Sequence, residues 1–177
     1  MIILVTGGQR SGKSSFAESV LKSEESVAYI ATARMTDEEM ALRVKKHQED
    51  RPKTWTSLER NYNLAHDIKE EAMILECVGT LVSNRLYDKT KDMEKIPPDL
   101  AKDIEDEIFE EVKALVDLAK DKDKKLVIVT NEVGLALTPM NNLARTYTDM
   151  VGRLNQGLAK LADEVYLVVA GIEVRIK

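Results

Sequence analysis

The sequence predicts an α/β domain with a doubly wound, mostly parallel sheet and crossover helices. Two observations support this fold class. Short apolar runs rich in β-branched residues alternate with segments of helical periodicity along the chain, as expected for parallel strands joined by crossover helices. A glycine-rich segment also follows the first apolar run and precedes the first helical one. With 177 residues and no repeat or linker, the chain is predicted to form one domain spanning 1–177.

Each element is predicted from its residue pattern. Runs such as Leu126 to Val129 are apolar without alternation, which indicates strands buried on both faces of a parallel sheet. Helices follow from apolar residues at helical spacing, and Pro97-Pro98 should end one helix and start another. The predicted strands are 2–6, 27–31, 72–78, 125–130, 164–170 and a short 172–176. The predicted helices are 13–22, 37–49, 60–70, 79–87, 99–121 and 141–162.

Composition narrows the class of protein. The net charge is −5 with Lys and Glu interleaved, so no basic face indicates nucleic-acid binding. The longest apolar stretch, Val165 to Ile172, is far below the roughly 20 residues of a membrane span. The N-terminus does not resemble a signal peptide. Cys77, the one cysteine, is expected to be a small buried residue. A cytoplasmic protein is the expectation.

The glycine-rich segment reads GGQRSGKS and fits the phosphate-binding pattern G-x-x-x-x-G-K-[ST] between a strand and a helix. Its glycines let successive N–H groups face one anion, and the following helix adds its positive end. Lys13 would reach the β- and γ-phosphates, and the Ser14 hydroxyl would ligate Mg²⁺. We therefore expect a P-loop NTPase-like fold that binds a nucleoside triphosphate. The predicted nucleotide-binding residues of the loop are Gly7, Gly8, Gln9, Arg10, Ser11, Gly12, Lys13 and Ser14.

Further candidates follow the other predicted strands, because ligands of such folds collect at the carboxyl ends of strands. Thr32, Ala33 and Arg34 follow the second strand, and Arg34 could meet a phosphate bidentately. Glu76 lies at the end of the third strand, the position of a carboxylate that organises Mg²⁺. Asp is more usual there, and a surface strand end is the alternative. The fourth strand leads into the polar segment Thr130 to Glu132.

Two helical positions are unusual. His47 shares a predicted helix face with Met40 and Val44; spacing alone favours a structural histidine, and the alternative is a nucleophile or proton shuttle. Gly152 interrupts a helix at a cost of about 1 kcal/mol relative to Ala, which hints at close approach by a ligand or another chain. It belongs to a polar stripe that an ordinary solvated face, with an Arg145–Asp149 pair, explains equally well. The stripe consists of Arg145, Asp149, Gly152 and Gln156. The second histidine, His66, is expected to be a surface residue.

Taken together, these segments resemble one family from end to end. Besides the phosphate loop, the matching blocks are RVKKHQEDRP (43–52), LECVGTLVSN (75–84), VTNEVGL (129–135), GRLNQ (152–156) and ADEVYLVVAGIEVRIK (162–177). The chain resembles the bifunctional adenosylcobinamide kinase and adenosylcobinamide-phosphate guanylyltransferase family of cobalamin biosynthesis. It departs from the family's pattern at 135–141, where a usual glycine and acid are missing.

The resemblance implies a two-stage transferase that acts on adenosylcobinamide, with Mg²⁺ as cofactor. The phosphate loop would hold ATP or GTP while a hydroxyl of the corrinoid's aminopropanol arm takes the γ-phosphoryl group. His47 would then attack the α-phosphorus of GTP, release pyrophosphate and pass GMP to the phosphorylated corrinoid. The resemblance also implies a homotrimer. It places Thr32 to Arg34, Gln48, Glu49, Asp50, Arg51, Glu59 and Glu76 around the nucleotide.

Two other functions stay open on the residues alone. The chain could be a small-molecule kinase, acting on a corrinoid or another acceptor, in which His47 is structural. It could also be a P-loop switch or ATPase subunit that uses the loop to change partners. Only the bifunctional transferase carries nucleotide covalently, which separates it from both alternatives.

Overall fold

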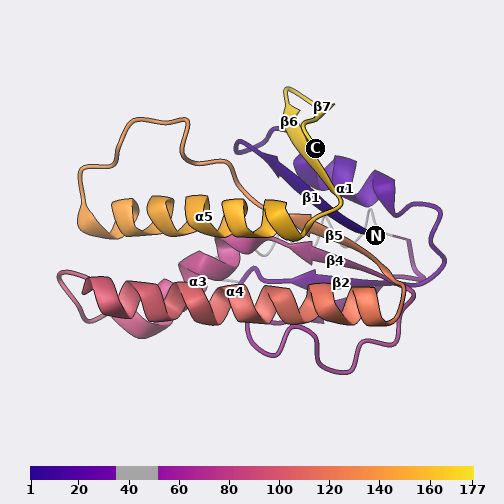
Figure 1. Cartoon of the computed structure of the whole chain (residues 1–177), viewed down its shortest axis with the longest axis horizontal. Helices are drawn as coiled ribbons and strands as arrows, with labels where there is room; N and C mark the ends of the chain where they lie inside the picture. The colour runs from indigo at the N-terminus through magenta and orange to yellow at the C-terminus, as the bar shows by residue number, and fades with distance from the viewer. Residues whose placement is uncertain (35–51) are drawn as a thin grey trace.

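The computed structural model describes residues 1–34 and 52–177. Its centre is a seven-stranded sheet in the order β3-β2-β4-β5-β1-β6-β7 (Figure 1). All neighbouring strands are parallel except β6 and β7, which form an antiparallel pair at one edge. The predicted α/β fold class is therefore confirmed. The strands are β1 (Ile2–Gly7), β2 (Val27–Ala31), β3 (Thr56–Glu59), β4 (Ala72–Glu76), β5 (Lys125–Val129), β6 (Glu164–Val169) and β7 (Ile172–Arg175).

Helices cover both faces of the sheet. The described helices are α1 (Lys13–Val20), α3 (Val78–Thr90), α4 (Pro98–Asp121) and α5 (Asn142–Leu161). α1 packs on one face, where Ala17 joins the core with Ile3 and Val5 of β1. The other three helices pack on the opposite face, around Ile2 and Leu4. Successive residues of β1 therefore enter different cores, which explains why the central strands are apolar without alternation.

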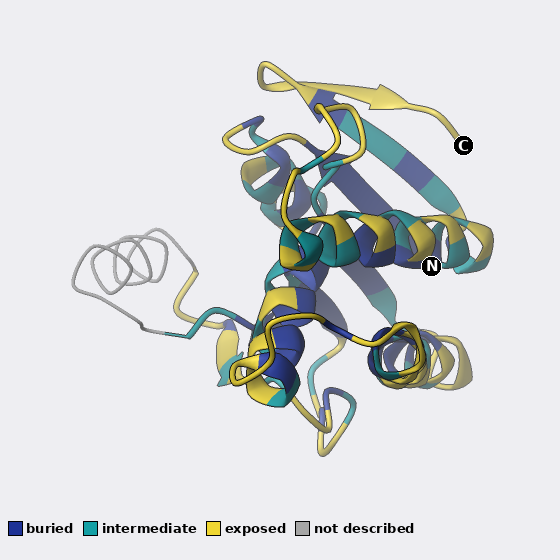
Figure 2. Cartoon of the chain, turned by 90° about the vertical axis from the view of Figure 1, so that its left-hand side faces the viewer, coloured by how far each residue is buried: buried dark blue, intermediate teal, exposed yellow. Residues whose placement is uncertain are grey.

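Burial follows this layering. The buried residues lie where the helices meet the sheet, and exposed residues lie on the outer helix faces and at the β7 edge (Figure 2). Gly157 of α5 allows α4 to pack closely, because a Cβ there would lie only 2.7 Å from Cε2 of Phe109. Cys77 is buried, as predicted. Among the described residues, no helix is long and apolar enough to cross a membrane.

The predicted helix over 60–70 is wrong. The chain there forms turns, with Asn63 and Asp67 at positive φ. Leu64 and Ile68 are buried, as they would be in an amphipathic helix, so the apolar spacing correctly indicated which side chains are buried. Tertiary bonds replace the helical ones: the Glu111 carboxylate of α4 accepts the backbone N–H groups of Asn63 and Leu64, at 3.1 and 3.0 Å. His66 is exposed, as predicted.

Other differences are smaller. β3 was not predicted, because its four residues carry one aliphatic side chain and are mostly exposed. The predicted strand over 72–78 ends at Glu76, since Val78 already begins α3. The predicted helix over 79–87 extends to Thr90. The predicted helix over 37–49 lies outside the described residues.

Candidate active site

The phosphate loop lies between β1 and α1, as the sequence predicted. Two of its glycines are required by the surrounding backbone. Gly12 has φ +96°, and a Cβ on it would lie 3.1 Å from Cα of Gly171. A Cβ on Gly7 would lie 2.5 Å from the carbonyl oxygen of Val168. The turn between β6 and β7 thus packs against the loop, and Gly171 donates its N–H to the Ser11 carbonyl at 2.8 Å.

The Lys13 side chain folds back onto the backbone of the phosphate loop. This side chain is largely buried, and Nζ donates a hydrogen bond to the Gly8 carbonyl at 3.2 Å. Lys13 is also the first residue of α1, so its ammonium group and the positive end of the helix act at the same place. Gly8, Gln9 and Arg10 of the loop are exposed. The arrangement can hold an anion against the N-terminus of α1.

Ser14 and Glu76 meet although 62 positions separate them in the chain. The Ser14 hydroxyl donates to Oε1 of Glu76 at 2.7 Å. The sequence placed both residues at a magnesium site from separate signals, and the fold brings them together. A hydroxyl and a carboxylate are hard oxygen donors of the kind that Mg²⁺ prefers beside substrate phosphates. The donor set therefore fits this ion.

Thr32 supports the turn that carries Glu76. It is fully buried, and its N–H donates to the Glu76 carbonyl at 2.8 Å. Its Oγ1 accepts the Cys77 N–H at 2.9 Å and lies 3.0 Å from the Cys77 carbonyl. The Glu76–Cys77 peptide bond is cis. Burial raises the pKa of the Cys77 thiol, and the neighbouring Glu76 raises it further. Such a thiol is a poor nucleophile.

Arg34 is paired with a carboxylate. Its guanidinium donates two hydrogen bonds of 2.6 Å to Asp88 of α3, and the Tyr62 hydroxyl donates to the same carboxylate at 3.0 Å. The hydrogen bond to Asp88 raises the pKa of Arg34, and it lowers the pKa of Asp88. To bind a phosphate bidentately, Arg34 must break its two hydrogen bonds to Asp88 and form two to the phosphate.

Glu59 ends β3 on the same edge of the sheet as Glu76. Ala31 of β2 is the register partner of both carboxylates, one on each side. Neighbouring strands lie about 4.8 Å apart, so the two glutamates flank β2 at the edge that carries the phosphate loop. The remaining predicted residues, His47, Gln48, Glu49, Asp50 and Arg51, lie outside the described residues.

One connecting residue of the site was not predicted. Asn155 of α5 accepts a hydrogen bond from the Thr130 hydroxyl at 2.7 Å and donates to the Asn131 carbonyl at 3.0 Å. The next residue, Glu132, donates its N–H to the Gly7 carbonyl at 3.0 Å. These bonds join α5, the end of β5 and the phosphate loop. The available signal was the placement of Asn155 in GRLNQ, one of the blocks that carry the family resemblance.

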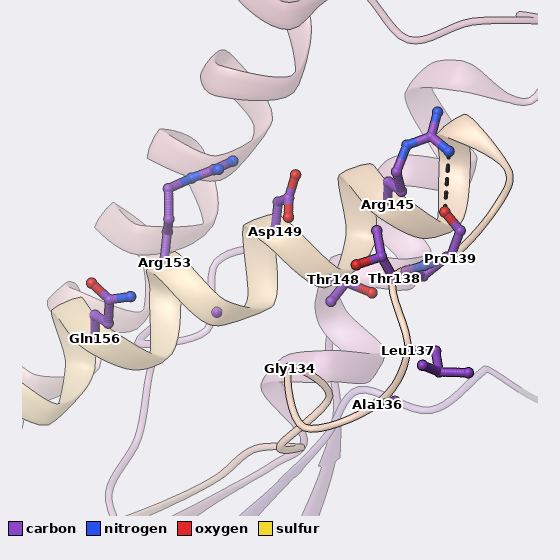
Figure 3. Close-up of a pocket in the computed structure, with 11 residues that line it drawn as sticks. Gly134, Ala136, Leu137, Thr138, Pro139, Arg145, Thr148, Asp149, Arg153 and Gln156 are labelled. Carbon is purple, nitrogen blue, oxygen red and sulfur yellow. Dashed lines mark hydrogen bonds between the residues drawn. The ribbon is translucent and has the colours of Figure 1, made fainter.

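A pocket of about 380 Å³ opens between α5 and the loop that follows β5 (Figure 3). All four residues of the predicted polar stripe line it. Arg145 bounds one end, where its Nη1 donates to the Pro139 carbonyl at 3.1 Å. At the other end Arg153 pairs with Glu105 of α4, at 2.7 Å. The lining residues are Gly134, Ala136, Leu137, Thr138, Pro139, Arg145, Thr148, Asp149, Gly152, Arg153 and Gln156.

Comparison with known proteins gives a consistent result. The family model described as cobinamide kinase / cobinamide phosphate guanyltransferase matches residues 3–176. The bifunctional adenosylcobalamin biosynthesis protein CobU of Escherichia coli is 43% identical over 182 aligned residues, covering 100% of both chains. The protein of the same name from Salmonella typhimurium is 42% identical with the same coverage. A KaiC-like protein from Pyrococcus horikoshii aligns with a TM-score of 0.44 at 10% identity, over 94% of this chain and 71% of its own.

Proposed function

The chain belongs to the cobinamide kinase / cobinamide phosphate guanyltransferase family, and we propose that its phosphate loop serves both reactions. It is an enzyme that phosphorylates cobinamide and transfers a guanylyl group to cobinamide phosphate. The observation that carries the residue assignment is the 2.7 Å hydrogen bond from Ser14 to Glu76. Ser14 directly follows Lys13 at the N-terminus of α1, which supports a metal site next to the phosphate-binding lysine.

In the first reaction the loop holds ATP or GTP. Its N–H groups and Lys13 bind the β- and γ-phosphates. Ser14 and Glu76 would hold Mg²⁺, which neutralises charge on the phosphate oxygens when bound. The hydroxyl oxygen of the aminopropanol arm of adenosylcobinamide forms a bond to the γ-phosphorus. The bond from that phosphorus to the bridging oxygen breaks, the nucleoside diphosphate leaves, and the hydroxyl proton is released.

In the second reaction GTP reacts at its α-phosphorus. We assign the nucleophile to His47 from the block RVKKHQEDRP, and this residue lies outside the described residues. The imidazole nitrogen bonds to the α-phosphorus, pyrophosphate leaves, and GMP stays on the histidine. A phosphate oxygen of adenosylcobinamide phosphate then bonds to that phosphorus, the phosphorus–nitrogen bond breaks, and adenosylcobinamide-GDP and free His47 result. Splitting the displacement avoids bringing two polyanions together in one step. Lys13 and the loop N–H groups stabilise the leaving pyrophosphate.

The test is a labelling experiment on the intact protein. We expect the purified chain, incubated with Mg²⁺ and GTP labelled at the α-phosphate, to keep label after denaturation. The label should be lost in acid and retained in base, as expected for a phosphorus–nitrogen bond. GTP labelled at the γ-phosphate serves as the control and should leave none. A chain that phosphorylates adenosylcobinamide but never retains α-label would be a kinase alone, with His47 structural.

The acidic residue of the proposed magnesium site gives a separate prediction. Glu76→Gln keeps an oxygen that can accept the Ser14 hydrogen bond but removes the negative charge. We expect the Mg²⁺ concentration for half-maximal kinase rate to rise about tenfold or more, the size of effect seen when metal-site partners are lost. Glu173→Gln, on the exposed edge strand β7, is the control and should leave it unchanged. An unaltered Mg²⁺ requirement in Glu76→Gln would remove Glu76 from the site.

The family resemblance also leads us to propose a homotrimer. Sedimentation equilibrium of the purified chain should give three times the 19.9 kDa chain mass. A monomer at micromolar concentration would contradict this assembly without affecting the assignment of the reactions.

A further inference from the structure

Among residues 1–34 and 52–177, which the structure describes, none packs against Gly152. A Cβ built on it would meet no atom within 4 Å. The second glycine of the same helix differs, because a Cβ on Gly157 would collide with Phe109 of α4. Close helix packing therefore explains Gly157 and leaves Gly152 unexplained. A glycine inside a helix lowers its stability, so its use at a position that the described residues leave open points to a bound ligand.

That open position lies in the pocket between α5 and residues 134–139 (Figure 3). Thr148, Asp149 and Gln156 line the pocket around it and together offer hydrogen-bond donors and acceptors. The side chains of Asp149 and Gln156 are exposed, so a ligand larger than the pocket can extend along α5. A flat patch of helix backbone with amide-binding groups beside it suits a flat macrocycle with amide substituents.

Backbone and side-chain hydrogen bonds connect the walls of the pocket to the phosphate loop. The loop that lines the pocket follows Glu132, whose N–H donates to the Gly7 carbonyl. Asn155 joins α5 to the end of β5. Of the proposed nucleotide residues, Arg34 follows β2, and Glu59 and Glu76 end β3 and β4. In the sheet these three strands lie on one side of β5, and β1, which leads into the phosphate loop, lies on the other.

We propose that this pocket seats an amide-bearing edge of the corrin ring of adenosylcobinamide, with Gly152 as the flat contact surface. The proposal rests on the proposed function, which supplies the ligand. The corrin carries several amide side chains around a flat ring, and its aminopropanol arm would extend toward the phosphate loop. Gly152 and Gln156 then determine acceptor binding in both reactions, while nucleotide binding is independent of them.

The test is a substitution that fills part of the pocket and is expected to leave the fold intact. Gly152→Leu places a side chain where the structure has open space, and leucine favours a helix, so the thermal unfolding midpoint should not fall. Binding of adenosylcobinamide is measured by equilibrium dialysis, from the corrin absorbance. We expect Kd to rise about tenfold or more, from steric exclusion. The Kd for GTP and the α-phosphate labelling should stay within about twofold of wild type, a change below 0.5 kcal/mol.

Lys160→Leu is the matched control, because it adds the same side chain to an exposed position of α5 outside the pocket. It should bind adenosylcobinamide as wild type does. Unchanged corrinoid binding by Gly152→Leu would overturn the inference and leave the proposed function standing. A changed sedimentation mass with unchanged corrinoid binding would identify this face as a subunit contact and also overturn it. A wild-type chain that neither binds adenosylcobinamide nor retains α-label would reject the proposed function itself.

Discussion

Lys13→Ala is expected to abolish most of both activities. The ammonium group is held inside the phosphate loop by its hydrogen bond to the Gly8 carbonyl, so it meets the phosphates without reorganising. Removing one such positioned donor costs about 10²- to 10³-fold in rate. We expect losses of that size in adenosylcobinamide phosphorylation and in the initial rate of labelling from α-labelled GTP. Both are measured at saturating Mg²⁺ on protein of unchanged circular dichroism.

Comparing the loss of phosphorylation with the loss of labelling in Lys13→Ala tests whether one loop serves both reactions. Lys22→Ala, an exposed lysine just after α1, removes the same charge nearby and should leave both rates within about twofold, since isolated surface charges contribute little. If Lys13→Ala loses phosphorylation but labels at the wild-type rate, the loop binds only the phosphoryl donor. GTP would then react from a second site, and the proposal of one loop for both reactions would be wrong.

His47→Asn is expected to separate the two reactions. The variant cannot form the bond to the α-phosphorus, so retained label should fall below about one part in 10³ of wild type, as deletion of a nucleophile commonly does. Phosphorylation of adenosylcobinamide should persist, because that step uses Lys13 and the proposed magnesium site. The readouts are acid-labile label on the denatured protein and phosphorylated corrinoid.

The chain offers a matched control for this variant. His66 is the only other histidine and is exposed, so His66→Asn should label and phosphorylate as wild type does. Full labelling of His47→Asn would show that a different residue is the nucleophile. Loss of phosphorylation in folded His47→Asn would show that the two reactions depend on one another at this site.

The central strands of the sheet were predictable because the residues of each strand carry, by themselves, the pattern that indicates it. β1, β4 and β5 are buried on both faces, so an apolar run alone indicates them. β3 has no such signal, because it lies at the edge and is mostly exposed. Its existence depends on backbone pairing with β2, from Ala28 opposite Thr56 to Ala31 opposite Glu59. Pairing of this kind leaves no mark on the side-chain pattern.

The error at 60–70 has the opposite cause. Leu64 and Ile68 have helical spacing and are both buried, yet the backbone between them turns. Glu111 takes two of the N–H groups that a helix would use internally, and Arg85 of α3 donates to the Asn61 carbonyl at 2.8 Å. These tertiary hydrogen bonds stabilise the turns more than the weak local preference of the segment would stabilise a helix. The sequence pattern correctly identified the buried residues and misassigned the backbone.

For the site, the sequence by itself determined the phosphate loop, because Gly7, Gly12 and Lys13 act within one short segment whose spacing is the signal. It also predicted Glu76 as an acid at a strand end, and the family resemblance predicted His47 as the nucleophile. Only the tertiary structure decided that Ser14 meets Glu76, that Arg34 pairs with Asp88, and that Gly152 lies open in a pocket. These relations join residues far apart in the chain, and the packing of the helices on the sheet sets their distances. Local spacing contains no information about such distances.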